Sequence, residues 1–271
     1  DYKQVIHRYL IPFFGKYNLT SVDGALVREF EIWRNEKIGR MPKASTLMTH
    51  ASAYNRVIET AIANGWLSKH QNIPTLSRRG VKTKARPAFT TAEIDQLLAF
   101  MPEWVAAGGH RNTGRQIKTL LRDYVEILLA TGMRCGKESL NMLWQHLEWY
   151  TVNDVRYLRI WVSGKTGGRW LIAKHRAVDV LKRLHARQTD IASVAFEDLF
   201  ATRVPHKLFR ISNGYQPVSL NGTFRRLMRD SELLKDDAGQ TRTLYSLRHT
   251  YATLELLRNG TDIHTLSKQM G

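Results

Sequence analysis

Three cationic side chains stand in sequence contexts that could present them to a phosphate group. Lys165 lies in the glycine-rich stretch WVSGKTGGRW. Arg134 follows the glycine that should end a buried helix, in ATGMRCGKESL, and Arg248 lies on the first turn of a helix with an apolar stripe, in LYSLRHTYATLELL. Guanidinium groups bind phosphate oxygens in a two-pronged manner, and each charge-assisted hydrogen bond is worth roughly 1.5–3 kcal/mol. Such a set could stabilise the charge that builds on phosphorus during phosphoryl transfer.

The Gly-Lys-Thr string in this stretch does not have the pattern of a nucleotide-binding loop. A P-loop needs a glycine five residues before that core, where Arg159 stands. A P-loop also opens a helix, whereas strand-like residues resume here at Arg169. The ten histidines never fall in metal-ligand spacing, and the sequence has no Gly-x-Ser-x-Gly elbow. We therefore expect a mechanism without a metal or another cofactor.

Charge is the most informative bulk property of the chain. The 271 residues include 41 Lys and Arg against 24 Asp and Glu, which gives a net charge of +17 and a pI near 10.2. The excess is spread along the chain, so a polyanion is the natural partner. No apolar run is long enough to span a bilayer, and the first residues lack a signal-peptide pattern. The single cysteine, Cys135, fits a reducing cytosol.

The first 80 residues predict a small helical bundle. Ser45 is positioned to cap a helix whose apolar residues recur with helical period, and Gly65 stands where that helix should end. A shorter apolar set around Val27, Phe30 and Trp33 predicts a partner helix. We expect these helices to form a first domain over residues 1–80.

A basic linker and a second domain, residues 81–271, are expected to follow. The stretch SRRGVKTKARP, residues 77–87, has no apolar period and ends in proline, which is typical of a linker. Thr90 and Glu93 form a capping box, a strongly apolar helix runs to a stop at Gly132, and residues 155–173 predict a strand pair joined through glycines. Further helices are expected at 177–187, 220–229, 246–258 and from residue 262. The predicted fold class is mainly α with a small β-hairpin, an N-terminal helical bundle followed by an α+β domain.

The chain resembles a tyrosine recombinase of the phage integrase type. ATGMR at residues 130–134 matches the first arginine box of that family, and SGKTGGR matches its hairpin lysine. SLRHTYAT, with the later NG and KQMG, matches the second box. The helical first part, with YLIPFFGKYNLTSV and STLMTHASAYNRVIETAIANGWL, is similar to the family's core DNA-binding domain. The resemblance implies two domains that clamp duplex DNA and a catalytic domain with the recombinase fold.

The resemblance also implies an activity, site-specific DNA recombination. DNA strands would be cleaved and rejoined through a 3′-phosphotyrosyl intermediate that conserves bond energy. Arg134 and Arg248 would hold the non-bridging oxygens of the scissile phosphate, and Lys165 would protonate the departing 5′-oxygen. Glu138 would support the active-site arginine. Tyr245 stands where the family usually has histidine and would donate a hydrogen bond to the phosphate.

Three features depart from the family pattern. Lys137 occupies the usual position of the acid, one residue before Glu138, and Tyr245 replaces the histidine of the second box. The family pattern continues past Gly271 to the tyrosine nucleophile. We therefore expect the nucleophile to lie beyond residue 271 and the 271 residues alone to be inactive. Whether an N-terminal arm-binding domain precedes Asp1 stays open at this point.

For three reactive side chains near the two boxes, we predict a structural role rather than a catalytic one. Tyr251 shares a helical face with Leu247 and Leu254, which predicts a core position rather than a replacement nucleophile. We expect His249 to be a structural hydrogen-bonding residue. Cys135, a lone thiol without a paired histidine, is expected to be a bystander or a core residue.

Double-stranded DNA is the expected partner. The linker is predicted to cross the DNA backbone with five basic residues: Arg78, Arg79, Lys82, Lys84 and Arg86. The family implies a homotetramer on DNA, accessory DNA-bending or directionality proteins, and a location at the nucleoid in the cytoplasm of a bacterium or a phage-infected host. Two alternatives stay open at this point: a non-catalytic DNA-binding protein of the same fold and a type IB topoisomerase-like activity.

Overall fold

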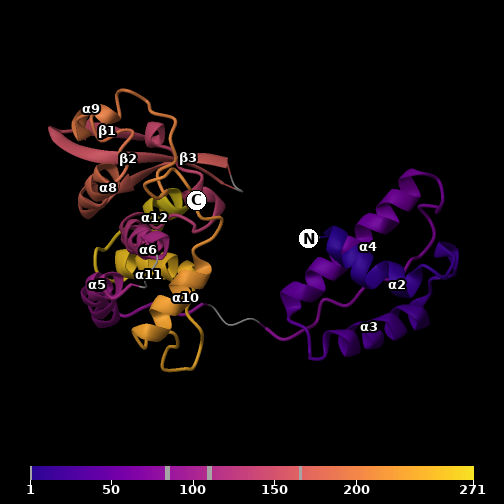
Figure 1. Ribbon diagram of the computed structural model, residues 1–271. Helices are drawn as coiled ribbons and strands as arrows, with labels where there is room; N and C mark the ends of the chain where they lie inside the picture. The colour runs from indigo at the N-terminus through magenta and orange to yellow at the C-terminus, as the bar shows by residue number, and fades with distance from the viewer. Residues whose placement is uncertain (1, 83–85, 109–111, 165–166) are drawn as a thin grey trace. The chain divides into compact units, whose positions relative to one another are not determined.

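The computed structural model describes residues 2–82, 86–108, 112–164 and 167–271. The chain divides into two compact units, residues 1–85 and 86–271, drawn in Figure 1. The expected fold class is confirmed, because the described residues form mainly helices together with one small antiparallel sheet. None of the helices in these described ranges is long and apolar enough to cross a membrane.

The first unit is a bundle of helices. Its elements are α1 (Tyr2–Val5), the π-helix η1 (Ile6–Leu10), α2 (Ile11–Phe14), the 3-10 helix η2 (Leu19–Ser21), α3 (Gly24–Ile38) and α4 (Ala44–Ala63). Phe30 of α3 is fully buried and packs against the rings of Phe13 and Phe14. These aromatic contacts join α2 to α3 in the core of the unit.

The start of α4 differs from the sequence expectation. The helix begins at Ala44, Lys43 is its N-cap residue, and no side chain caps it, so the prediction for Ser45 is wrong. The Ala44 backbone N–H instead donates to Val81 O at 3.0 Å. A backbone contact with a distant segment therefore satisfies a donor that a capping side chain would otherwise satisfy.

The second unit contains most of the helices and the sheet. Its helices are α5 (Thr91–Ala106), α6 (Asn112–Thr131), α7 (Lys137–Leu140), the 3-10 helix η3 (Trp144–His146), α8 (Arg176–Ala186), α9 (Phe196–Leu199), α10 (Asn221–Asp230), α11 (Leu244–Leu257) and α12 (Ile263–Met270). Its strands are β1 (Leu147–Val152), β2 (Val155–Gly164) and β3 (Gly167–Ala173). The capping box at the start of α5 is present, since the Glu93 N–H donates to Thr90 Oγ1 at 3.2 Å and the Thr90 N–H donates to Glu93 Oε2 at 2.8 Å.

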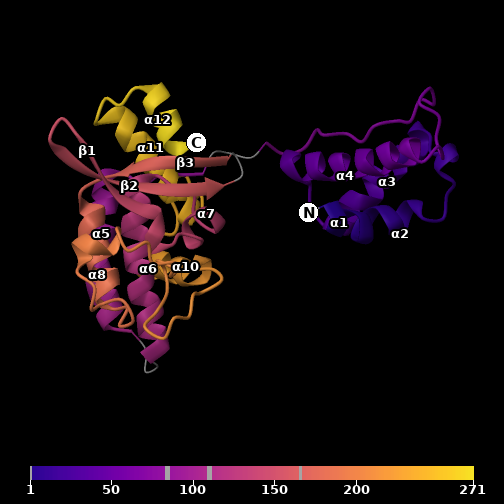
Figure 2. The ribbon, with the colours of Figure 1, turned by 90° about the horizontal axis from the view of Figure 1, so that it is seen from above.

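The sheet has one strand more than expected. Its order is β1-β2-β3, with antiparallel neighbours, so the predicted strand pair is β2–β3 and β1 is an addition. Asn153 and Asp154 form the two-residue turn between β1 and β2, and both have positive φ. Figure 1 shows α8 and α6 on one side of the sheet, and Figure 2 shows α12 beside β3.

Helix α6 runs through the core of the second unit and contacts both α8 and α11. It ends at Thr131, and Gly132 follows with a φ of +66°. A Cβ on Gly132 would lie 2.3 Å from Cδ1 of Tyr251, so only glycine lets α11 pack this closely. The end of α6 and the first turns of α11 are thereby held side by side, which positions the residues of the candidate site.

Candidate functional site

The fold brings Arg134 and Arg248 together. Arg248 is only 7% exposed, and its Nη1 donates to Gly132 O at 2.7 Å. Its Nη2 donates to Met270 O at 2.9 Å and reaches Gly271 O at 3.5 Å. Arg134 Nη2 donates to the same Gly271 oxygen. Two guanidinium groups from distant parts of the sequence are therefore brought together, and both contact the backbone oxygen of Gly271, the last residue of the sequence.

Glu138 fixes the orientation of Arg134. Its side chain is 2% exposed and accepts hydrogen bonds from the Arg134 backbone N–H at 3.0 Å and from Arg134 Nη1 at 3.1 Å. Burial alone would raise the pKa of this carboxyl group, but hydrogen bonds from Arg169 and Arg134 outweigh burial and lower the pKa below its usual value. Glu138 is therefore ionised at neutral pH.

Arg169 also belongs to this cluster, although the sequence did not lead us to predict it as a site residue. Its Nη1 and Nη2 donate to Glu138 Oε2 at 3.2 Å and Oε1 at 2.8 Å, and its Nε donates to Gln269 O at 3.2 Å. A signal was present in the sequence. Arg169 stands two residues before the buried Leu171 in the same strand, and alternation along a strand puts both on the core-facing side.

The glycine-rich hairpin ends beside this cluster. Lys165, the expected general acid, lies outside the described residues, as does the linker residue Lys84. Gly164 is the last residue of β2, and a Cβ there would lie 2.6 Å from Glu138 Oε2. The absence of a side chain at Gly164 lets the backbone approach the carboxylate, so the last residue of β2 lies beside Glu138 and Arg134.

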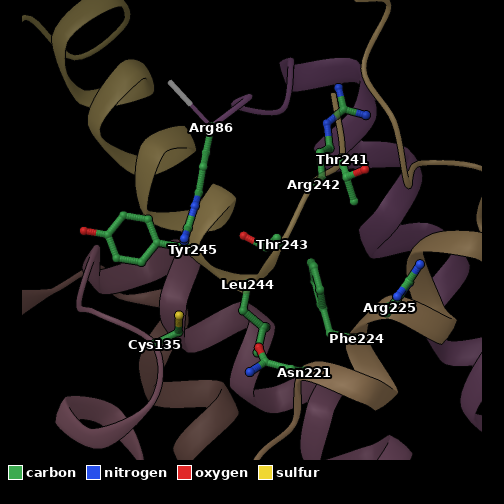
Figure 3. Close-up of a pocket in the computed structure, with 10 residues that line it drawn as sticks. All are labelled: Arg86, Cys135, Asn221, Phe224, Arg225, Thr241, Arg242, Thr243, Leu244 and Tyr245. Atoms are coloured by element: carbon green, nitrogen blue, oxygen red, sulfur yellow. The ribbon is translucent and has the colours of Figure 1, made fainter. Parts of the chain in front are cut away.

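A pocket of about 470 Å³ is lined by Cys135, Tyr245 and Arg86 together with seven other residues (Figure 3). The Arg86 guanidinium lies 4.9 Å from the centre of the Tyr245 ring. Arg225 adds positive charge to the wall, whereas Arg242 is paired there with Glu93 at 2.7 Å. Burial lowers the pKa of the Arg248 guanidinium. The pocket adjoins the arginine cluster, because its lining includes Cys135, the chain neighbour of Arg134, and Tyr245, which precedes Arg248 in α11.

Three other reactive side chains lie near the two boxes, and burial shifts the pKa of each. Tyr251 is buried against Gly132, as expected for a core residue, and burial raises the pKa of its hydroxyl to about 12. Burial also raises the pKa of the Cys135 thiol, which keeps it protonated. The pKa of His249 is lowered by burial and by the charges of Arg86 and Arg248, so this histidine is neutral at pH 7.

The linker residues fall in different units. Arg78, Arg79 and Lys82 are exposed and belong to the first unit, whereas Arg86 belongs to the second, where it packs on Tyr245. Their contact with DNA stays a prediction. No group of three or more His, Cys, Asp or Glu side chains within the described ranges is arranged to hold a metal ion.

Comparison with solved structures identifies the fold. The XerH site-specific recombinase bound to difH substrate is 17% identical with a TM-score of 0.62, over 97% of this chain and 70% of that one. The Tn1549 transposon integrase in complex with circular intermediate DNA is 20% identical with a TM-score of 0.64, over 99% and 89%. A lambda integrase dimer bound to a COC′ core site is 16% identical with a TM-score of 0.63, over 100% and 85%. No protein-family model and no curated protein sequence matches the chain.

Proposed function

Because the chain has the fold of the tyrosine recombinases and integrases, we propose that it is a site-specific DNA recombinase of the tyrosine class. The observation that carries the proposal is the proximity of the Arg134 and Arg248 guanidinium groups, which share a backbone contact and are held in place by Glu138 and by Gly132 O, respectively. Two fixed guanidinium groups in a partly buried site stabilise the charge on a phosphodiester in its transition state. The net charge of +17 supports a DNA substrate.

Each residue of the cluster has a distinct role in this proposal. Arg134 and Arg248 bind the non-bridging oxygens of the scissile phosphate, and Glu138, held by Arg169, keeps Arg134 in place. Lys165 protonates the departing 5′-oxygen from the hairpin that begins at Gly164 beside the carboxylate. Ionised Glu138 does not itself take part in proton transfer, because its lowered pKa and its arginine partners keep it charged.

Tyr245, stacked under Arg86, replaces histidine as a phosphate contact. A phenol donates a hydrogen bond without carrying charge, whereas a histidine could also exchange a proton near neutral pH. The adjacent Arg86 guanidinium supplies positive charge beside the Tyr245 ring. The linker would thereby contribute one arginine to the phosphate site and the others to the neighbouring DNA backbone.

The nucleophile in this proposal is a tyrosine outside the 271 residues. Tyr54, Tyr124 and Tyr251 are buried, and burial raises the pKa of each to about 12, which disfavours attack by their hydroxyls. Tyr245 is assigned to the phosphate, and Tyr150 lies on a solvent-facing part of the sheet. Assembly as a tetramer belongs to the same proposal, since one neighbour of this fold is a lambda integrase tetramer bound to a Holliday junction.

The test is covalent capture of a nicked duplex by the full-length gene product. We expect a protein–DNA band that survives denaturation, and we expect Arg248→Ala to lower its rate of formation by about a hundredfold or more. Arg258→Ala is the matched control, because Arg258 is an exposed arginine at the end of the same helix. Equal rates for the two variants refute the phosphate site, and duplex binding without any covalent band assigns a DNA-binding role without catalysis.

A further inference from the structure

The sheet has a second face that the arginine cluster does not use. The face opposite the buried Leu158, Ile160 and Leu171 carries a row of large side chains: Tyr150, Tyr157, Trp161, Trp170 and Ile172. All of these except Tyr157 are 37–40% exposed. Solvent-facing positions of an antiparallel sheet are usually polar, so a concentration of exposed aromatic side chains indicates a binding surface.

Trp161 and Trp170 form the centre of this face. They are directly opposite each other in the β2–β3 pairing, with ring centres 5.3 Å apart and planes inclined by 64°. The Trp161 ring also covers Gly168, where a Cβ would lie only 2.3 Å from it. Each indole is thus supported by its neighbours while part of its surface stays open to solvent, and little ordering is needed when a flat ligand stacks on it.

Arg159 adds a cation between the rings. Its guanidinium lies 4.5 Å from the centre of the Trp170 ring and 4.6 Å from that of Tyr150. Glu148 is the one carboxylate among the described strand residues of this face, and it is already paired with Arg159. Aromatic rings interleaved with a guanidinium plane are the means by which proteins hold single-stranded nucleic acid, because every base has a π-face.

The position of the tryptophan pair indicates which strand would be bound. Two residue pairs, 162–169 and 163–168, separate it from Gly164 and Gly167, where the described parts of the hairpin end. In the proposed reaction a DNA strand is cut at this hairpin, and before the cut strand can be rejoined to another strand, the bases next to the break must leave their pairing partners. We propose that this face of the sheet binds unpaired bases of the released DNA strand by stacking on Trp161 and Trp170. The inference rests on the proposed function and adds a strand-holding surface to it.

Fluorescence anisotropy with two labelled DNAs tests this inference. One is a fully paired duplex, and the other has the same sequence with a short unpaired bubble. We expect the protein to bind the bubble more tightly, and we expect Trp161→Ala or Trp170→Ala to weaken binding to the bubble by roughly tenfold while the Kd for the paired duplex stays unchanged. Trp66→Ala is the control, since Trp66 is an exposed tryptophan of the first unit and its loss should not alter the ratio of the two Kd values.

A second measurement uses the unaltered protein, so it does not depend on the folding of a variant. A bubble that carries 5-iodouracil is irradiated in the complex, and the cross-linked peptides are identified by mass spectrometry. We expect the cross-links on the peptide that contains Trp161 or Trp170. Cross-links confined to other peptides, or an unchanged Kd ratio in both alanine variants, overturn the inference.

Further outcomes distinguish this inference from a self-association surface and from the proposed function. If the alanine variants lose self-association in light scattering and keep the Kd ratio, the face joins two copies of the chain and the inference is wrong. If the protein binds the paired duplex and shows no preference for the bubble, only this inference is wrong. If it binds neither DNA, the proposed function is wrong as well.

Discussion

Glu138→Gln is the substitution that tests the arginine cluster most directly. The amide has the shape of the carboxylate but no charge, and its NH2 group would face a guanidinium donor. Glu138 accepts hydrogen bonds from Nη1 of Arg134 and from Nη1 and Nη2 of Arg169, and its side chain is 2% exposed. Breaking a buried ion pair by removing one partner costs about 3–5 kcal/mol. Since the Arg134 side chain is 24% exposed and can be rehydrated, we expect a loss near the lower end, about 3 kcal/mol.

The assay is urea unfolding followed by hydrogen exchange of peptides from α6, which reports on the second unit alone. With a urea m value of about 3 kcal/mol/M, the midpoint should fall by about 1 M. Glu197→Gln is the matched control. Glu197 pairs with Arg156 at 3.0 Å, but both side chains are about half exposed, so its loss should cost at most about 1 kcal/mol.

The pH dependence of this effect has a definite sign. Because the pKa of Glu138 is lowered in the fold, its stabilisation is present above the ordinary value of 4.5 and is lost as the pH falls through the lower folded pKa. The difference in unfolding free energy between the wild type and Glu138→Gln should therefore be constant from pH 7 to 5 and shrink only at more acidic pH. A loss below 1 kcal/mol at pH 7, no larger than that of Glu197→Gln, would refute the view that the buried carboxylate organises the site.

Two predictions concern other parts of the fold. Burial lowers the pKa of His50 to about 4, so the neutral side chain contributes its full stabilisation of the first unit above pH 6.5, and that contribution falls as the pH drops. Between pH 7 and 5 we expect the unfolding free energy of this unit to fall by about 2 kcal/mol, as measured by hydrogen exchange of α4 peptides. The loss should be absent in His50→Leu. Gly132→Ala should destabilise the second unit by more than 2 kcal/mol in thermal unfolding, because its φ is positive and its Cβ would overlap the Tyr251 ring. Gly239→Ala, at a similar φ of +72° but with open space around it, should cost only about 1 kcal/mol, and equal losses for the two glycines would contradict the packing argument.

The fold was largely predictable because its main signals are local. The capping box at Thr90 and the glycine stop at Gly132 depend on residues within one turn, and both are observed. The missed strand β1 also had a local signal. Asn153 and Asp154 between strand-forming residues favour a two-residue turn with positive φ, which is the observed connection. Prediction of this strand failed through an overlooked turn pattern and not through any competing tertiary force.

Other features depend on contacts between distant residues and have no local signal. The true start of α4 is set by Val81, and the stacking of Arg86 on Tyr245 joins a linker residue to the first turn of α11. Sequence periodicity cannot reveal either pairing, because each partner belongs to a different element. The convergence of Arg134 and Arg248 was foreseen only through the resemblance of their two boxes to a known family.

In the stretch WVSGKTGGRW, the residues of one hairpin alternate between the two faces of the sheet. Alternation puts Gly164 and Arg169 on the side of Glu138, and it puts Trp161 and Trp170 on the opposite side. The same register that brings the backbone within reach of the carboxylate therefore exposes the indole pair to solvent. A one-residue insertion in either strand would reverse both sides at once, since a slip of one residue moves every following side chain to the other face. The glycines next to Lys165 and the tryptophans that flank them are thus constrained together, although they contact different groups.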